Sequence, residues 1–162
     1  MNEMIIKPEE DLDRRQILRL MGLGAVALAA GSMVAAGPAA ATPASADSYL
    51  KKLSGGKAYK EGGINLKLPE IAENGAVVPL TVTVDSPMTA GDYVKAIHVA
   101  ADANPNPEVA TFHLTPAMGR AQVSTRLRLA KTQNIIVVAV MSNGSVHRVT
   151  RKVKVTIGGC GG

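Results

Sequence analysis

Apolar residues gather into short runs of strand length from residue 64 onward. The runs cover residues 64–68, 77–84, 93–100, 109–114, 121–129, 134–141 and 146–157. Turn residues separate them, and the Asn-Gly pair in Ser142-Asn-Gly-Ser145 is typical of a tight β-hairpin. Since the connections leave no room for crossover helices, the pattern predicts an all-β fold, an immunoglobulin-like antiparallel β-sandwich over residues 64–157.

Two of these runs alternate clearly between apolar and polar positions. In residues 121–129, the odd positions are Ala, Val, Thr, Leu and Leu, whereas the even positions are Gln, Ser, Arg and Arg. In residues 146–157, Val149, Val153 and Ile157 also share odd positions, with Arg151 among them. Side chains alternate between the two faces of a strand, so we expect the odd positions to face the core. We expect Arg151 to lie where this buried face begins to reach water.

The segment just before the first run, residues 47–63, is polar and rich in glycine. It contains a predicted short helix at residues 48–53, which Gly55 and Gly56 end. We interpret residues 47–63 as an N-terminal leader that packs on the sandwich.

Residues 1–46 have the layout of an export signal. Arg14 and Arg15 precede an uncharged stretch rich in Ala and Gly, which runs from residue 20 to residue 46. Ala44-Ser45-Ala46 then supplies the small residues that a signal peptidase accepts. The sequence therefore predicts a twin-arginine (Tat) signal peptide over residues 1–46, cleaved before Asp47. The glycines and prolines of the stretch argue against a permanent membrane anchor, although its length would span a bilayer.

A twin-arginine signal also predicts where the protein works. This pathway exports proteins that are already folded, so we expect a periplasmic protein that leaves the cytoplasm with a bound partner. A chain of 162 residues has room for one ordinary domain, so a second catalytic domain is not expected.

Composition narrows the chemistry further. The net charge is +5, but aromatic residues make up only 2% of the chain, so bases would find few stacking partners and we predict no nucleic-acid binding. His98, His113 and His147 raise the hypothesis of a copper site. Such a site needs a histidine and a methionine after its cysteine, where this chain has only Gly161 and Gly162. We therefore predict no metal, no cofactor and no catalytic residue.

The chain has a single cysteine, Cys160, which stands between two glycine pairs as Gly158-Gly159-Cys160-Gly161-Gly162. Glycine has no side chain and wide backbone freedom, so residues 158–162 predict a thin, flexible arm. Cys160 is three residues beyond Ile157, which is about 10 Å at roughly 3.3–3.6 Å per residue. A thiolate forms disulfides, persulfides and S-thiosulfonates, but the arm offers no general base. This arrangement indicates a covalent carrier and not an enzyme.

Two interpretations of Cys160 stay open on this evidence. One is a carrier of sulfur, and the other is a structural or adhesive β-sandwich whose Cys160 forms an intermolecular disulfide. The last run also carries four basic residues, namely Arg148, Arg151, Lys152 and Lys154. They either attract an anionic substrate and lower the thiol pKa or are ordinary exposed strand charges. We favour exposed charge, because Lys154 lies up to about 20 Å from Cys160 along an extended chain.

Several motifs together match one known family. They are the terminal Gly158-Gly159-Cys160-Gly161-Gly162, Ile71-Ala-Glu-Asn-Gly-Ala76 with Val78-Pro79, Ser86-Pro87-Met88, and Asn104-Pro-Asn-Pro107. With these motifs the mature chain resembles the SoxY family, the sulfur-carrier subunits of the periplasmic Sox system that oxidises thiosulfate.

The resemblance implies a set of roles and partners. Cys160 takes the role of covalent sulfur attachment, and Gly158, Gly159, Gly161 and Gly162 form the arm. The implied permanent partner is a SoxZ-like subunit in a heterodimer. The implied transient partners are a haem-containing enzyme that couples thiosulfate to the cysteine, a hydrolase that releases sulfate, and a sulfur dehydrogenase.

Overall fold

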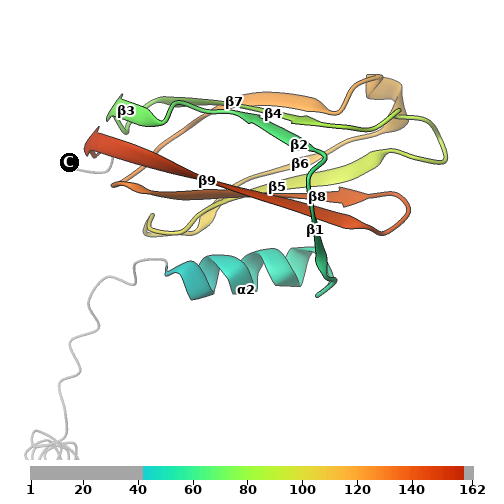
Figure 1. The fold of residues 1–162 in the computed structure, drawn as a ribbon, viewed down its shortest axis with the longest axis horizontal. Helices are drawn as coiled ribbons and strands as arrows, with labels where there is room; N and C mark the ends of the chain where they lie inside the picture. Colours follow the sequence, from blue (N-terminus) through green and yellow to red (C-terminus); the bar gives the residue numbers. More distant parts are fainter. Residues whose placement is uncertain (1–41, 159–162) are drawn as a thin grey trace, which may run out of the picture. The chain divides into compact units, whose positions relative to one another are not determined.

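The structure is a computed structural model that describes residues 42–158. Within this range, strands form two sheets that pack face to face, and an α-helix lies against the outside of one of them (Figure 1). The elements are α2 (Pro43–Leu53), β1 (Tyr59–Glu61), β2 (Ile64–Lys67), β3 (Ile71–Asn74), β4 (Val78–Val84), β5 (Val94–Ala101), β6 (Glu108–His113), the 3-10 helix η1 (Pro116–Met118), β7 (Gln122–Leu127), β8 (Gln133–Met141) and β9 (Val146–Ile157). The prediction of an all-β sandwich is confirmed.

The two sheets differ in size and in the direction of their strands. The small sheet has the order β2-β4-β7 and is antiparallel throughout. The large sheet has the order β1-β9-β8-β5-β6, and β3 also pairs with β9. Strand β9 is antiparallel to β8 but parallel to both β1 and β3, which pair with its beginning and its end (Figure 1).

The seven predicted runs correspond to β2 and β4–β9, whereas β1 and β3 were not predicted. These two strands are short and mostly exposed, and Ala72 is the one buried residue in the pair. They carry no alternation of apolar and polar residues that could be read as a strand. The expectation of purely antiparallel pairing was therefore wrong along the outer edge of β9.

The core between the sheets is aliphatic, as the composition indicated. Residues that are no more than 2% exposed line it from both sheets, among them Val78, Leu80, Val82, Ile97, Val99, Leu127, Ile135, Val137 and Val153. Each such side chain contributes roughly 1.5–3 kcal/mol through burial. The predicted alternation is confirmed in residues 121–129. Along β9 it holds in part: Val153 is buried and Val149 and Val155 are half-buried, whereas Arg151 is exposed. Ile157 departs from it, with 67% of its surface exposed, because the end of β9 runs past the core.

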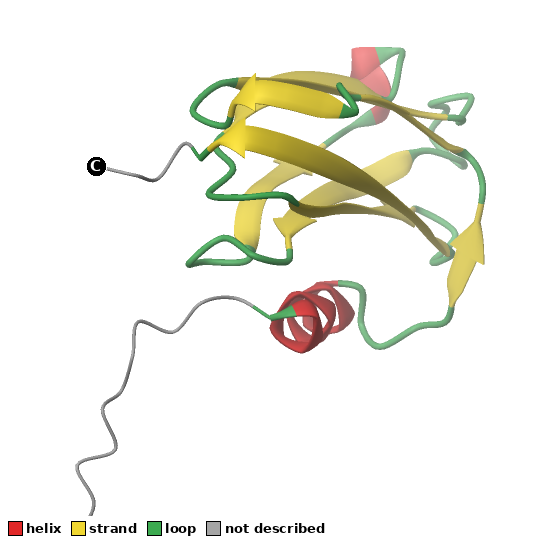
Figure 2. Ribbon diagram, turned by 60° about the vertical axis from the view of Figure 1, so that its left-hand side comes forward, coloured by secondary structure: helices red, strands yellow, loops and turns green. Residues whose placement is uncertain are grey.

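Helix α2 covers the outer face of the large sheet (Figure 2). Ala46 and Leu50 are fully buried there, in an apolar cluster that includes residues of β5, β8 and β9. The predicted helix is confirmed, but it begins at Pro43 and not at residue 48. The predicted signal boundary between residues 46 and 47 therefore falls inside α2. No helix in residues 42–158 has both the length and the apolar character that a membrane span requires.

Candidate functional site

The described part of the chain stops two residues before the predicted attachment site. Cys160, Gly159, Gly161 and Gly162 lie outside residues 42–158, whereas Gly158 is described. The structure thus shows how the chain approaches the arm. We call the place where β9 leaves the sandwich the arm root, which consists of Gly75, Leu129, Ala130, Ile157 and Gly158.

The end of β9 is held from the side of β3. Ile157 pairs with Asn74, and its carbonyl oxygen accepts a hydrogen bond of 2.7 Å from the backbone N–H of Gly75. The carbonyl of Gly75 in turn accepts from the N–H of Leu129, also at 2.7 Å. Gly75 therefore ties the last residue of β9 to the segment that follows β7.

The other side of β9 is held by that same segment between β7 and β8. The hydroxyl of Thr132 accepts a hydrogen bond of 2.9 Å from the N–H of Val155 and donates to its carbonyl oxygen at 3.3 Å. The pairing of β8 with β9 begins at Gln133 and Val153, so β8 provides no backbone hydrogen bonds to the residues of β9 after Val153. The two bonds of Thr132 take their place. The last residues of the strand are thus bonded along both edges.

Within the arm root, Gly158 packs closely against the backbone of Ala130. A β-carbon placed on this residue would overlap the carbonyl oxygen of Ala130. Any other amino acid would therefore have to displace either the chain at residue 158 or the backbone at residue 130. Glycine at this position fixes where the chain leaves the fold, which is a different role from the flexibility that its sequence context suggested.

Asn104 secures the segment that carries Ala130. Its side-chain oxygen accepts hydrogen bonds from the N–H of Ala130 at 3.0 Å and from Nε2 of Gln133 at 2.8 Å. Its Nδ2 donates to the carbonyl of Arg128 at 2.9 Å. Gln133 completes the connection, because its Oε1 accepts from the N–H of Ala103 at 2.9 Å. Asn104 thus joins the loop after β5 to the segment between β7 and β8, which contributes Leu129 and Ala130 to the arm root.

Three of the four motifs that carried the family resemblance therefore meet in space. Residues 71–76 supply β3 and Gly75, residues 104–107 supply Asn104, and the terminal motif begins at Gly158. The fourth, residues 86–88, lies beyond the opposite end of β4, where Met88 is buried with a φ of 51°. Spacing along the chain gave no sign of this convergence, because it depends on the unpredicted strand β3.

The histidines do not come together as a metal site. His98 is buried in β5 and shares a hydrogen bond of 3.0 Å with the hydroxyl of Thr111. Burial, with a smaller contribution from the charge of His113, lowers the pKa of His98. His147 instead bonds through Nδ1 to the carbonyl of Gly62, at 2.9 Å. In residues 42–158, no group of three or more His, Cys, Asp and Glu side chains is placed to hold a metal ion.

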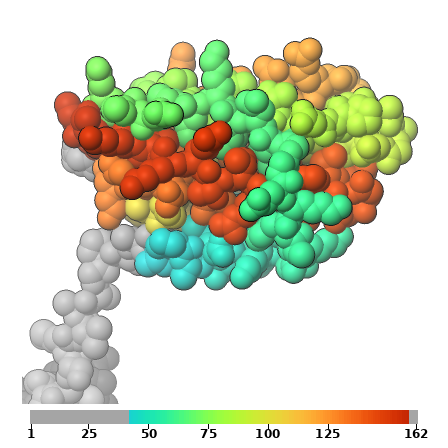
Figure 3. Space-filling model, viewed as in Figure 1, coloured from blue at the N-terminus to red at the C-terminus, as the bar shows by residue number. Residues whose placement is uncertain are grey.

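The basic residues of β9 lie along its exposed surface, which Figure 3 shows between β3 and α2. Arg151, Lys152 and Lys154 are exposed. Arg148 is engaged elsewhere, because its guanidinium lies 5.1 Å from the centre of the Tyr59 ring and 2.7 Å from a carboxylate oxygen of Asp47.

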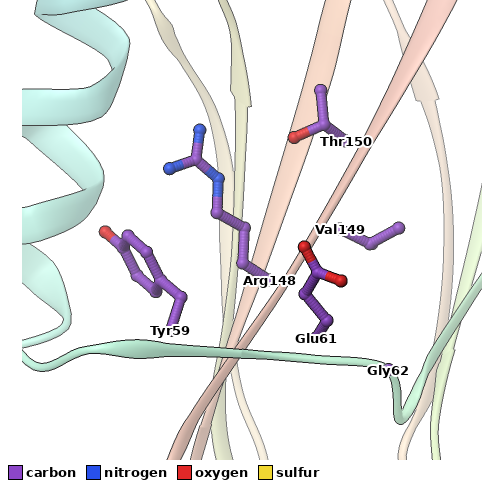
Figure 4. Close-up of a pocket in the computed structure, with 6 residues that line it drawn as sticks. All are labelled: Tyr59, Glu61, Gly62, Arg148, Val149 and Thr150. Carbon is purple, nitrogen blue, oxygen red and sulfur yellow. The ribbon is translucent and has the colours of Figure 1, made fainter.

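The Arg148 side chain borders a hollow of about 630 Å³ beside β1 (Figure 4). This hollow lies at the start of β9, so it is roughly 30 Å along the strand from the arm root. Arg148 therefore lies far from the arm root, and the interpretation of Arg151, Lys152 and Lys154 as exposed strand charge agrees with the structure.

Comparison with known proteins gives one family and one fold. The sequence profile described as "Sulfur oxidation protein SoxY" matches residues 50–160. The solved structure of the sulfur carrier protein SoxY from Chlorobium limicola f thiosulfatophilum is 41% identical to the chain, with a TM-score of 0.58 over 68% of this chain and 96% of that one. No curated protein sequence matches.

More distant structures share the architecture alone. The superoxide reductase (neelaredoxin) from Ignicoccus hospitalis is 15% identical, with a TM-score of 0.53 over 71% of this chain and 94% of that one. A putative superoxide reductase from Thermotoga maritima is 20% identical, with a TM-score of 0.52 over 60% and 93% of the two chains. At these identities the likeness concerns the β-sandwich and not its chemistry.

Proposed function

Because the chain belongs to the SoxY family of sulfur oxidation proteins, we propose that it is a periplasmic carrier that holds sulfur covalently on Cys160 during thiosulfate oxidation. One observation carries this proposal. The family match extends to residue 160 and so includes the only cysteine of the chain. The Chlorobium structure, at 41% identity, is that of a sulfur carrier protein.

The geometry of the arm root supports presentation of the thiol to other proteins. The backbone is bonded on both edges up to Ile157 and packs on Ala130 at Gly158. From Gly158, two residues lead to Cys160, a reach of about 7 Å at roughly 3.3–3.6 Å per residue. A strand end that is fixed by hydrogen bonds, followed by a short glycine segment, would hold the Cys160 sulfur within a small distance of the sandwich. The absence of side chains in that segment would let the sulfur enter the active site of a partner enzyme.

The proposed chemistry needs only a thiolate from this chain. In the loading step, the Cys160 thiolate and the sulfane sulfur of thiosulfate form an S–S bond, and two electrons pass to a haem-containing partner enzyme. In the release step, water attacks the terminal sulfone of Cys–S–S–SO₃⁻. This yields sulfate, two protons and a persulfide anion that stays on the cysteine. A sulfur dehydrogenase then oxidises the remaining sulfane sulfur.

The carrier itself would catalyse none of these steps. The hydrogen bonds of the arm root join backbone groups, amide side chains and a hydroxyl, and none uses a titratable side chain as a general base. Acid–base groups and oxidants would come from the hydrolase, the haem enzyme and the dehydrogenase. A SoxZ-like subunit would be the permanent partner and would travel with this chain through the twin-arginine pathway.

Exchange of the cysteine tests the proposal. In a reconstituted thiosulfate oxidation assay with the SoxZ-like subunit and the partner enzymes, Cys160→Ser should abolish sulfate release. It should leave the melting temperature and the pairing with the SoxZ-like subunit unchanged, because residue 160 follows the last strand of the sandwich in the sequence.

A matched variant separates a thiol on the arm from a thiol anywhere on the surface. Ser124 is exposed in β7, so the double variant Cys160→Ser, Ser124→Cys keeps one accessible thiol away from the arm. We expect it to be inactive. Sulfate release by the double variant, or full activity of Cys160→Ser alone, would contradict the proposed role of Cys160. Activity loss only through unfolding would place the cysteine inside the fold.

A further inference from the structure

Helix α2 has a complete N-terminus that begins before the predicted signal boundary. Thr42 is its N-cap, with extended backbone angles (φ −111°, ψ 159°), and Pro43 stands at the first position of the helix. The hydroxyl of Thr42 accepts a hydrogen bond of 3.2 Å from the N–H of Ser45, and the hydroxyl of Ser45 accepts one of 2.8 Å from the N–H of Thr42. This reciprocal capping box satisfies backbone donors that the first turn leaves free.

The peptide bond between Ala46 and Asp47 lies in this first turn, already docked on the sheet. Ala46 is fully buried against residues of β5, β8 and β9, and its N–H donates to the carbonyl of Thr42 at 3.0 Å. Asp47 is tied to β9 by its ion pair with Arg148. The Ala44-Ser45-Ala46 triplet is thus helical and partly packed inside the domain.

The helical, docked conformation of Ala44-Ser45-Ala46 makes this triplet a poor substrate for signal peptidase. Proteases cut segments that are exposed and locally unfolded, so a bond in a docked helix reacts only while the helix is open. A twin-arginine substrate arrives folded, with α2 in place. Cleavage before Asp47 would also remove the capping box and the buried methyl group of Ala46.

A second Ala-x-Ala triplet, Ala39-Ala40-Ala41, ends directly before the N-cap. We propose that signal peptidase hydrolyses the bond between Ala41 and Thr42, so that the mature protein begins at Thr42 with α2 intact. Water adds across this bond, which leaves a carboxylate on Ala41 and an α-amino group on Thr42. The inference rests on the proposed export and adds its processing site. It replaces the boundary after Ala46 that the sequence pattern had predicted.

N-terminal sequencing and intact-mass measurement of the periplasmic protein, purified from cells that express the full chain, test this inference. The expected N-terminus is Thr42. An N-terminus at Asp47, with a mass lower by residues 42–46, overturns the inference but leaves the proposed export in place. A protein that keeps Met1 or stays in the cytoplasm overturns both.

Matched substitutions at the first position of each triplet provide a second test that does not depend on the mass of the mature protein. Ala39→Tyr should block processing and cause the uncut precursor to accumulate. Ala44 is exposed in the first turn of α2, so Ala44→Tyr should fold normally and still yield Thr42 as the N-terminus. Accumulation of precursor in Ala44→Tyr, with normal processing of Ala39→Tyr, would show that Ala44-Ser45-Ala46 is the triplet cut and would overturn the inference.

Discussion

The side chain of Asn104 offers the sharpest test of how the arm root is built. Asn104→Ala removes three hydrogen bonds, to Arg128, Ala130 and Gln133. A typical bond contributes a net 0.5–1.5 kcal/mol, so three amount to about 3 kcal/mol. The bond to Arg128 is exposed to water, which reduces the expected loss of unfolding free energy to about 2 kcal/mol. For a domain of this size, that loss corresponds to a fall in melting temperature of roughly 8 °C.

The same loop provides a matched control. Asn106 is exposed, and its side chain accepts one local hydrogen bond of 3.2 Å from the N–H of Glu108. Asn106→Ala should therefore cost no more than about 0.5 kcal/mol in the free energy of unfolding. Asn104→Asp keeps the acceptor oxygen but loses the amide donor to Arg128, so its effect should lie between those of the two alanine variants.

Denaturant unfolding gives the free energies, and hydrogen exchange localises the change. The amide of Ala130 donates to Asn104, so its protection should fall in Asn104→Ala, whereas amides in the centre of β8 should change only by the global loss of stability. If Asn104→Ala proves no less stable than Asn106→Ala, or if Ala130 keeps its protection, Asn104 does not hold the arm root and the reasoning is wrong.

Two further predictions concern the end of β9 and the buried histidine. Gly158→Ala should reduce exchange protection at Gly75 and lower the melting temperature by a few degrees, because its β-carbon would overlap Ala130. Gly161→Ala adds the same methyl group beyond the cysteine and should change neither. Since burial lowers the pKa of His98, the unfolded chain binds a proton first, at about pH 6.5. Stability should therefore be retained above pH 6.5 and decline as the pH falls below it, and His98→Gln should weaken that decline in urea titrations at each pH. Equal pH dependence in the two proteins would rule out His98 as its source.

The sequence predicted the sandwich well because its strands carry their own signal. Residues 121–129 alternate so regularly that the buried face follows from a period of two, and the Asn-Gly turn locates the last hairpin. Strands β1 and β3 carried no such signal. Each is short, and each is stabilised by pairing with β9 and not by a buried face of its own.

The Gly-Gly-Cys-Gly-Gly motif that predicts an arm is plain in the sequence, whereas the contacts of the arm root are not. Cys160 stands out because of its glycine neighbours, but the contact between Gly158 and Ala130 joins residues that are distant along the chain. The bonds of Asn104 cross the same distance. A proline and asparagine-rich loop is typically interpreted as a turn, and only the tertiary structure shows which of its asparagines secures another segment.

The start of α2 was misplaced for a similar reason. Ala44 and Ala46 look like the end of a signal because both are small, yet Ala46 is also small enough to pack flat against the large sheet. A short apolar residue satisfies either environment. In the structure Ala46 belongs to α2, and the cap at Thr42 and the ion pair of Asp47 that accompany it depend on partners that the local sequence pattern does not reveal.

The central claim is that Cys160 holds sulfur covalently, and intact-mass analysis tests it most directly. The protein should be isolated from cells grown on thiosulfate, measured before and after treatment with a reductant, and digested to locate any adduct. We expect sulfane or thiosulfonate additions on the C-terminal peptide that contains Cys160, all removed by the reductant. Finding only the free thiol, or only a disulfide between two copies of the chain, would contradict the carrier function and favour a structural role for the cysteine.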